Sequence, residues 1–160
     1  MGDFDEFLDV LGTEDELGMI IRAHIHIESR LNEIFDIVMM DSSYIDKMNL
    51  DFHDKVNLAI ACGLHQRFAA PLNNIGTLRN NFAHRLGTKI TKNEADSLYS
   101  CFTGDDKQVM QDAYKKTKKN LGFNGAASMS KLTPKEKLKL MLASLHHIIR
   151  AAANEIREHN

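Results

Sequence analysis

The 160-residue sequence contains no tryptophan, only two prolines and two cysteines, and no hydrophobic run that approaches the length of a membrane span. Cys62 and Cys101 lie far apart, so the chain offers neither a disulfide framework nor a CxxC metal pair. The acidic start, MGDFDEFLDV, lacks the basic residues and apolar core of a signal peptide. We therefore expect a cytoplasmic protein with no membrane segment.

The sequence also lacks a large excess of charge of one sign, because 20 basic and 22 acidic residues leave a net charge of −2. This balance argues against a domain that binds duplex DNA over a broad basic face. The charges are nevertheless divided: residues 1–54 carry −11 and residues 55–160 carry +9. Either an acidic face meets a basic face within the fold or a dimer, or the basic half forms a binding surface.

Apolar residues recur at helical spacing almost throughout the chain, and no alternating run is long enough to indicate a sheet. The pattern predicts an all-α fold, with residues 1–160 forming a single-domain bundle of six to seven helices. Capping boxes are predicted at Thr13, Thr91 and Thr133, and a mobile loop at about 120–131. The expected helices cover about residues 3–11, 13–40, 51–63, 71–86, 92–103, 105–119 and 134 to the C-terminal region.

The densest candidate for chemistry is the segment LRNNFAHR, residues 78–85. On a helix, Asn80 and His84 point away from the apolar stripe, and Arg79 lies at its edge. One interpretation is that these side chains face solvent or a neighbouring helix. The other is RNA cleavage, with His84 as general acid or base, Arg79 stabilising the charged phosphorane and Asn80 orienting them. A straight helix cannot aim Arg79 and His84 at one phosphate, so catalysis requires a second protomer or a local distortion.

The spacing of Arg79 and His84 resembles the R-x4-H motif of the HEPN superfamily of helical domains. Many members of that superfamily are metal-independent ribonucleases, often acting as dimers that bring two motifs together. The resemblance therefore implies a metal-independent endoribonuclease or RNA-binding protein as one candidate function, with a homodimer as its assembly.

A longer part of the chain, roughly residues 15–90, is similar to the mannitol operon repressor family of bacterial regulators. The resemblance rests on RAHIHIESRL (22–31), FHDKVNLA (52–59), Leu64, Pro71-Leu72 and the segment 78–85. The family implies an all-helical protein that regulates transcription without an obvious helix-turn-helix, and the residues show no basic recognition helix after a tight turn. The resemblance thus implies a repressor, and because no reader helix is visible we expect it to work through a protein partner or by weak nucleic-acid contact.

The histidines do not indicate a metal site. His24 and Glu28 lie one helical turn apart, but His26 is turned about 200° from His24. We therefore expect His24 to be a buried, hydrogen-bonded histidine on the apolar stripe, and we predict no metal and no cofactor. His146 and His147 lie off the stripe of the last helix and are predicted to be solvated.

Lysines concentrate on both sides of the expected loop and are the candidate nucleic-acid contacts. One interpretation is a solvated helix end that suits the helix dipole; the other is an edge that binds phosphates weakly and without sequence preference. The candidates are Lys115, Lys116, Lys118, Lys119, Lys131 and Lys135.

Overall fold

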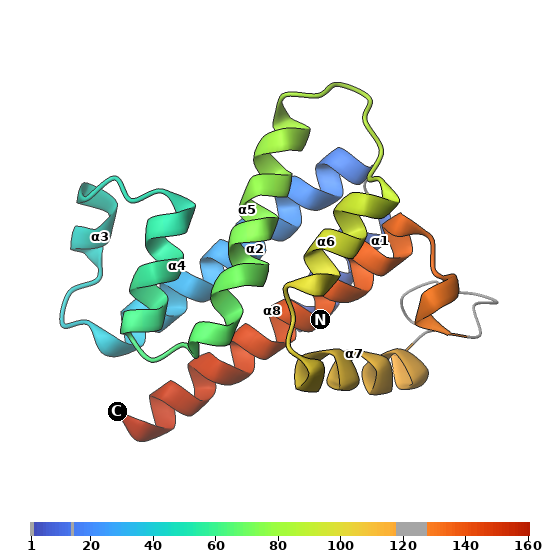
Figure 1. Cartoon of the computed structure of the whole chain (residues 1–160). Coiled ribbons are helices and arrows are strands. Elements are labelled where there is room, and N and C mark those ends of the chain that lie inside the picture. Colours follow the sequence, from blue (N-terminus) through green and yellow to red (C-terminus); the bar gives the residue numbers. More distant parts are fainter. Residues whose placement is uncertain (1, 14, 118–127) are drawn as a thin grey trace.

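The computed structural model describes residues 2–13, 15–117 and 128–160, and the all-α prediction is confirmed (Figure 1). The described residues form eight α-helices and two short 3-10 turns. These are α1 (Asp3–Thr13), α2 (Glu16–Val38), α3 (Ser43–Lys47), α4 (Phe52–Ala61), η1 (Gln66–Phe68), α5 (Ala69–Ala83), α6 (Lys92–Ser100), α7 (Gly104–Thr117), η2 (Met129–Lys131) and α8 (Pro134–His159).

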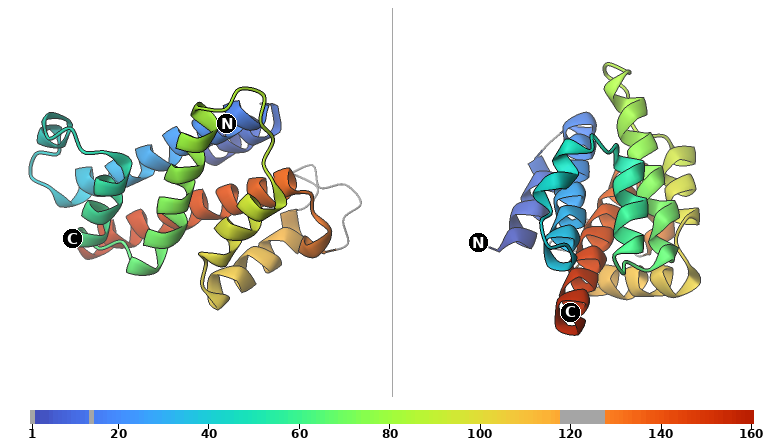
Figure 2. Two further views of the ribbon diagram at one scale, coloured as in Figure 1. Left: turned by 45° about the horizontal axis from the view of Figure 1, so that its top comes forward. Right: turned by 90° about the vertical axis from the view of Figure 1, so that its left-hand side faces the viewer.

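The two longest helices, α2 and α8, run side by side through the molecule, and the others pack around them (Figures 1 and 2). Helices α4 and α5 cover α2, α6 and α7 cover α8, and α1 contacts both long helices. One main hydrophobic cluster receives side chains from all of α1–α8, including Phe7, Phe35 and Phe82. No helix in the described part of the chain has a stretch long and apolar enough to cross a membrane.

The start of α2 differs from the prediction. Thr13 still belongs to α1, and the N-cap is Asp15, whose carboxylate accepts a hydrogen bond from the Gly18 amide at 2.7 Å. Glu16 does not close a capping box; its carboxylate accepts a hydrogen bond from the Ile90 amide. The residue expected to cap its own helix thus ties α2 to the segment before α6.

The other two capping boxes are confirmed. Thr91 and Glu94 bond reciprocally at the start of α6, and Thr133 and Glu136 do the same at α8. Pro134 follows the second cap at the first helical position, where its missing amide hydrogen costs nothing. Local sequence signals therefore fix these two helix starts.

Helix α5 begins earlier and ends earlier than expected. Pro71 lies in its first turn, where a proline is tolerated because the first four amides have no partner within the helix. The helix ends at Ala83, and Gly87 lies in the following turn at a φ of +71°, which suits glycine. His84 is consequently a C-cap residue rather than part of the helix interior.

Two further regions differ from the expected pattern. Between residues 40 and 51, where no helix was expected, the structure has the additional short helix α3, whose Ile45 is buried in the core. Most of the loop predicted at 120–131 lies outside the described residues. Its last part, Met129–Lys131, forms the 3-10 turn η2.

Candidate functional site

A polar cleft lies between α2, α4 and α5 and has a volume of about 560 Å³. This size falls within the range of small-molecule sites in proteins. Helix α2 contributes the middle of its length, α4 its first turn and α5 its central turns. The cleft is lined by His24, Glu28, Leu50, Asp51, Phe52, His53, Asn73, Gly76, Thr77, Arg79 and Asn80.

The close approach of α4 to α5 depends on Gly76. A Cβ atom at this position would lie 2.9 Å from Cδ1 of Phe52, closer than real Cβ contacts allow. The Phe52 ring also packs against His24, tilted by 45° with the ring centroids 4.2 Å apart. Gly76, Phe52 and His24 therefore form a packed floor of the cleft that joins the three helices.

His24 is buried, as predicted, but charged side chains lie close to it. Its Nδ1 lies 3.9 Å from the Glu28 carboxylate, a distance longer than a hydrogen bond. Burial lowers the pKa of His24 below its usual 6.5; Glu28 opposes this, and the charges of Arg79 and Lys55 lower the pKa further. At neutral pH the imidazole is accordingly uncharged, with one donor and one acceptor nitrogen.

The two carboxylates of the cleft are both engaged. Glu28 pairs with Lys55 of α4 at 2.7 Å. Asp51 caps α4 by accepting a hydrogen bond from the Asp54 amide at 2.8 Å. These bonds use the acidic groups to hold α2 and α4 in place; Lys55 offsets the charge of Glu28, and Asp51 keeps its charge at the N-terminus of α4.

The cleft lining also carries imidazole, amide and hydroxyl groups from α4 and α5. His53 and Asn73 share a 2.9 Å hydrogen bond between Nδ1 and Oδ1. One turn along α5, the Thr77 hydroxyl donates to the Asn73 carbonyl at 3.1 Å. The Nε2 atom of His53 and the Nδ2 atom of Asn73 lie outside this bond.

The structure separates the residues of the R-x4-H motif. Arg79 and Asn80 both line the cleft, and the guanidinium donates to the Asn80 Oδ1 at 2.9 Å. His84 is exposed, as its position off the apolar stripe predicted, but it caps the end of α5 and does not line the cleft. Within one chain, Arg79 therefore shares a cleft with His24 and His53 instead.

Of the other histidines discussed in the sequence analysis, His146 was predicted wrongly. His146 is fully buried rather than solvated, and its ring stacks on Phe7 with the centroids 4.2 Å apart. The stripe analysis missed this because α1 covers a second side of α8, where it buries His146 against His26 and Phe7. His147 is exposed, as expected. In the described residues, no three His, Cys, Asp or Glu side chains are grouped so as to hold a metal ion.

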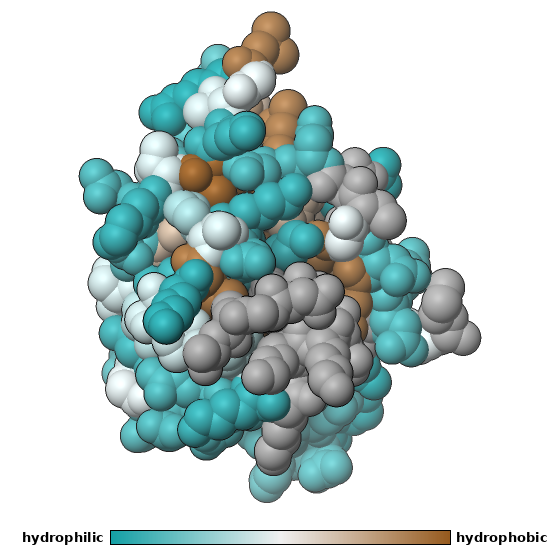
Figure 3. All heavy atoms as spheres, turned by 90° about the vertical axis from the view of Figure 1, so that its right-hand side faces the viewer, coloured by the Kyte–Doolittle hydropathy of each residue, from teal (hydrophilic) through white to brown (hydrophobic). Residues whose placement is uncertain are grey.

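The lysine candidates are only partly described. Lys118 and Lys119 lie outside the described residues, as does the side chain of Lys116. Lys115 lies 3.7 Å from Asp112, and Lys131 is exposed on η2. This side of the molecule is largely hydrophilic where the side chains are described (Figure 3).

The start of α8 adds two lysines to that edge. Lys135 is half-buried there, and its charge contributes, after burial, to lowering the pKa of Lys139. Tyr114 and Leu140 pack together beneath these residues, with Met129 and Leu132 beside them. The described part of the edge thus combines some lysines with a small apolar cluster that joins α7 to α8.

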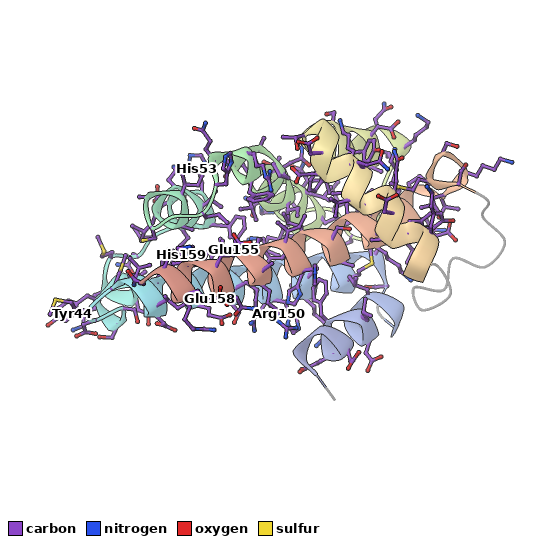
Figure 4. The ribbon with its side chains drawn as sticks, turned by 90° about the horizontal axis from the view of Figure 1, so that it is seen from below. Tyr44, His53, Arg150, Glu155, Glu158 and His159 are labelled. Carbon is purple, nitrogen blue, oxygen red and sulfur yellow. The ribbon has the colours of Figure 1, made fainter. Side chains whose placement is uncertain are left out.

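An exposed apolar corner was not recognised in the sequence. It consists of residues 36–48, the end of α2 followed by α3, and we call it the α3 corner. Met40 is fully exposed, and Tyr44 and Met48 are 59% and 63% exposed. Figure 4 shows Tyr44 at one end of the molecule, beyond the end of α8. Its signal in the sequence is a group of large apolar residues among aspartates and serines just after a helix.

The α3 corner is also acidic. Asp36, Asp41 and Asp46 are exposed there, and Lys47, its one basic residue, lies over the Tyr44 ring at 3.9 Å. A recess of about 240 Å³ adjoins the corner between α2 and α3. The recess is lined by Asn32, Phe35, Asp36, Ser42, Ser43, Ile45 and Asp46.

No family model, curated protein or solved structure matches this chain. The cleft and the α3 corner are therefore interpreted from their own chemistry.

Proposed function

We propose that this chain is a cytoplasmic bacterial regulator of transcription, similar to the mannitol operon repressor family, that acts by binding a protein partner. The observation that carries this proposal is the α3 corner, where Met40, Tyr44 and Met48 are exposed. Methionine and tyrosine are enriched in protein interfaces because they supply large apolar contact area. Tyr44 of α3 and Met48, the C-cap residue of this helix, lie four residues apart and so face the same side.

The partner is expected to present a basic and apolar segment. Three aspartates surround the exposed side chains, and two of them, Asp36 and Asp46, line the adjoining recess. A lysine or arginine of the partner fits this recess, while its apolar side chains cover Met40 and Met48. Complementary charge of this kind steers association and selects among partners.

Direct reading of DNA by this region is disfavoured by charge. Helix α4 follows α3 across a short turn, as a second helix would in a helix-turn-helix. Its N-terminal turn, however, carries Asp51 and Asp54, and its exposed side chains include His53 and Asn57 rather than a basic row. A helix with these residues would meet the DNA phosphates with negative charge.

The regulatory proposal is tested in the source cell by deleting the coding sequence and measuring transcripts. Reintroducing the wild-type chain is expected to restore the transcript profile. The double variant Met40→Ser/Met48→Ser is expected to fail, because truncating interface anchors weakens binding by about tenfold or more.

The matched control is Leu86→Ser/Val109→Ser, which alters two exposed apolar residues elsewhere. This control is expected to restore the profile fully. Equal restoration by both double variants would show that the α3 corner is not the regulatory surface. An unchanged profile in the deletion strain would overturn the regulatory role itself.

The alternative function is a metal-independent endoribonuclease using Arg79, Asn80 and His84. What favours it is that all three side chains are exposed, so RNA or a second copy can reach them. Incubating the folded protein with mixed RNA in EDTA tests it. Cleavage that is lost in His84→Ala would support the enzyme, and no cleavage by a folded dimer would exclude it.

A further inference from the structure

We infer that the cleft between α2, α4 and α5 binds a small molecule that carries an oxyanion group and several hydroxyl groups. Arg79 and Asn80 would hold the oxyanion, and His24, His53 and Asn73 would hold the hydroxyls. This site shares no residue with the α3 corner, so the inference is independent of the proposed function.

The charge arrangement in the cleft favours an anion near Arg79. In the described part of the chain no carboxylate pairs with this arginine, and its recorded hydrogen bond goes to the neutral Asn80 amide. A guanidinium has five donors, which leaves several of them for a ligand. Of the two carboxylates in the lining, Glu28 is offset by its pair with Lys55, and Asp51 lies at the N-terminus of α4, where the helix dipole offsets part of its charge.

Arginine suits an oxyanion for geometric reasons as well. Its planar fork makes two parallel hydrogen bonds with a carboxylate or a phosphate, and such charge-assisted bonds are stronger than neutral ones. Asn80 follows Arg79 and accepts from it through Oδ1, so the Asn80 Nδ2 group is a further donor at the same wall. The shared chemistry of the ligand is therefore an oxyanion, either a phosphate or a carboxylate.

The rest of the cleft suits hydroxyl groups. A hydroxyl both donates and accepts, and the uncharged imidazole of His24 offers one donor and one acceptor. His53 and Asn73 hold each other through one atom each, which fixes their orientation and leaves Nε2 of His53 and Nδ2 of Asn73 for a ligand. Side chains fixed in this way lose little conformational freedom when a ligand binds.

The size of the cleft agrees with such a ligand. A volume of about 560 Å³ accommodates a molecule of the size of a sugar phosphate or a sugar acid. Phe52 and Leu50 give one apolar patch in an otherwise polar lining, which suits the C–H face of a sugar ring. A large apolar ligand would instead leave the polar groups of His24, His53 and Asn73 without partners.

Isothermal titration calorimetry of the full chain at fixed ionic strength tests the inference with four probes. These are glucose 6-phosphate, glucuronate, glucose and inorganic phosphate. At least one of the two oxyanion-bearing sugars is expected to bind about tenfold or more tightly than glucose, and more tightly than inorganic phosphate. Which of the two binds better identifies the oxyanion as phosphate or carboxylate.

Variants locate the binding. Arg79→Met is expected to weaken the better probe about tenfold or more, because it removes a charge-assisted pair. Arg150→Met is the matched control, since Arg150 lies on α8 away from His53 and outside the cleft (Figure 4). Thr77→Trp places a large ring in the cleft and is expected to abolish binding of both sugars, with thermal unfolding confirming that each variant is folded.

Three outcomes would overturn the inference. One is that neither oxyanion-bearing sugar binds more tightly than glucose. Another is equal weakening by Arg79→Met and Arg150→Met, which would indicate general electrostatic attraction. The last is that inorganic phosphate binds as tightly as the sugars, which would leave His24, His53 and Asn73 without a role.

Discussion

The cleft and the α3 corner depart from the usual distribution of side chains in opposite ways. In the cleft, polar groups such as His24 and Asn73 lie in a recess between helices. At the α3 corner, apolar side chains such as Met40 and Tyr44 lie in solvent. Folding alone favours neither arrangement, because it gains from burying apolar groups and from solvating polar ones. The two regions therefore present opposite chemistry, one a polar recess and the other an exposed apolar surface.

The largest expected effect is on the free energy of unfolding, which a substitution in the core should lower far more than one at the α3 corner. Phe7→Ala is expected to lower the free energy of unfolding by about 3–5 kcal/mol, because Phe7 is fully buried and stacks on His146. Met40→Ala is expected to change it by less than about 0.5 kcal/mol, since Met40 is fully exposed. Chemical denaturation of both variants measures the difference. A loss of several kcal/mol in Met40→Ala would contradict the exposure of the corner.

A smaller effect tests the floor of the cleft. Gly76→Ala is expected to destabilise the protein by up to about 2 kcal/mol, because crowding against Phe52 costs about 1–3 kcal/mol while alanine gains roughly 1 kcal/mol in a helix. Gly12→Ala in α1 meets no atom within 4 Å and is expected to stabilise by about 0.5–1 kcal/mol. The two unfolding midpoints should therefore move in opposite directions. Movement in the same direction would mean that α4 and α5 are not in close contact at Gly76.

Comparing the predicted helices with the structure shows which features the sequence alone can reveal. Helix starts with their own local chemistry were predictable, as at Thr91 and Thr133, because a capping box involves only residues three positions apart in sequence. The cap at Asp15 was missed because Glu16 is recruited by Ile90, a residue far away in the chain. Likewise, His146 could be placed only after α1 was known to cover it.

The candidate sites show the same limit. The segment 78–85 was recognisable from residue types, and Arg79 and Asn80 do line a cleft. Their neighbours His24 and His53 come from α2 and α4, so their convergence depends on tertiary packing that no local pattern encodes. The α3 corner was missed because helical periodicity identifies buried faces and gives no signal for exposed apolar groups on a short helix.

The pH dependence of stability distinguishes the cleft histidine from an exposed one. Because burial lowers the pKa of His24 in the folded protein, the unfolded chain binds a proton at higher pH than the folded one. The free energy of unfolding is therefore expected to fall as the pH drops below about 6.5, until the folded pKa is passed. In His24→Gln this part of the fall should vanish, whereas the exposed-residue control His147→Gln should keep it. An unchanged pH profile in His24→Gln would show that His24 is not held uncharged.

The smallest expected effect concerns a charge that, unlike Arg79, is fully paired. Asp96 on α6 bonds with Lys137 on α8 at 2.8 Å and with Lys92, and these lysines lower its pKa from 3.8 to about 2. The stability from this pair is present above pH 3.8 and is lost as the pH falls towards 2. Asp96→Asn should flatten the acid limb of the stability profile slightly, as measured by thermal unfolding between pH 4 and pH 2. Because exposed ion pairs contribute little, a large change at pH 7 would contradict this description.

The most direct test of the central claim, that the α3 corner binds a basic and apolar segment of a partner protein, is site-specific photo-crosslinking in the source cell. The photoreactive residue p-benzoylphenylalanine replaces Tyr44 in one strain and Val109 in another, and mass spectrometry identifies the crosslinked peptides. We expect one partner peptide rich in lysine or arginine and apolar residues at position 44, lost in the Met40→Ser/Met48→Ser background and absent at position 109. Crosslinking at position 44 to an acidic peptide, to a second copy of this chain, or to nothing beyond the position-109 background would contradict it.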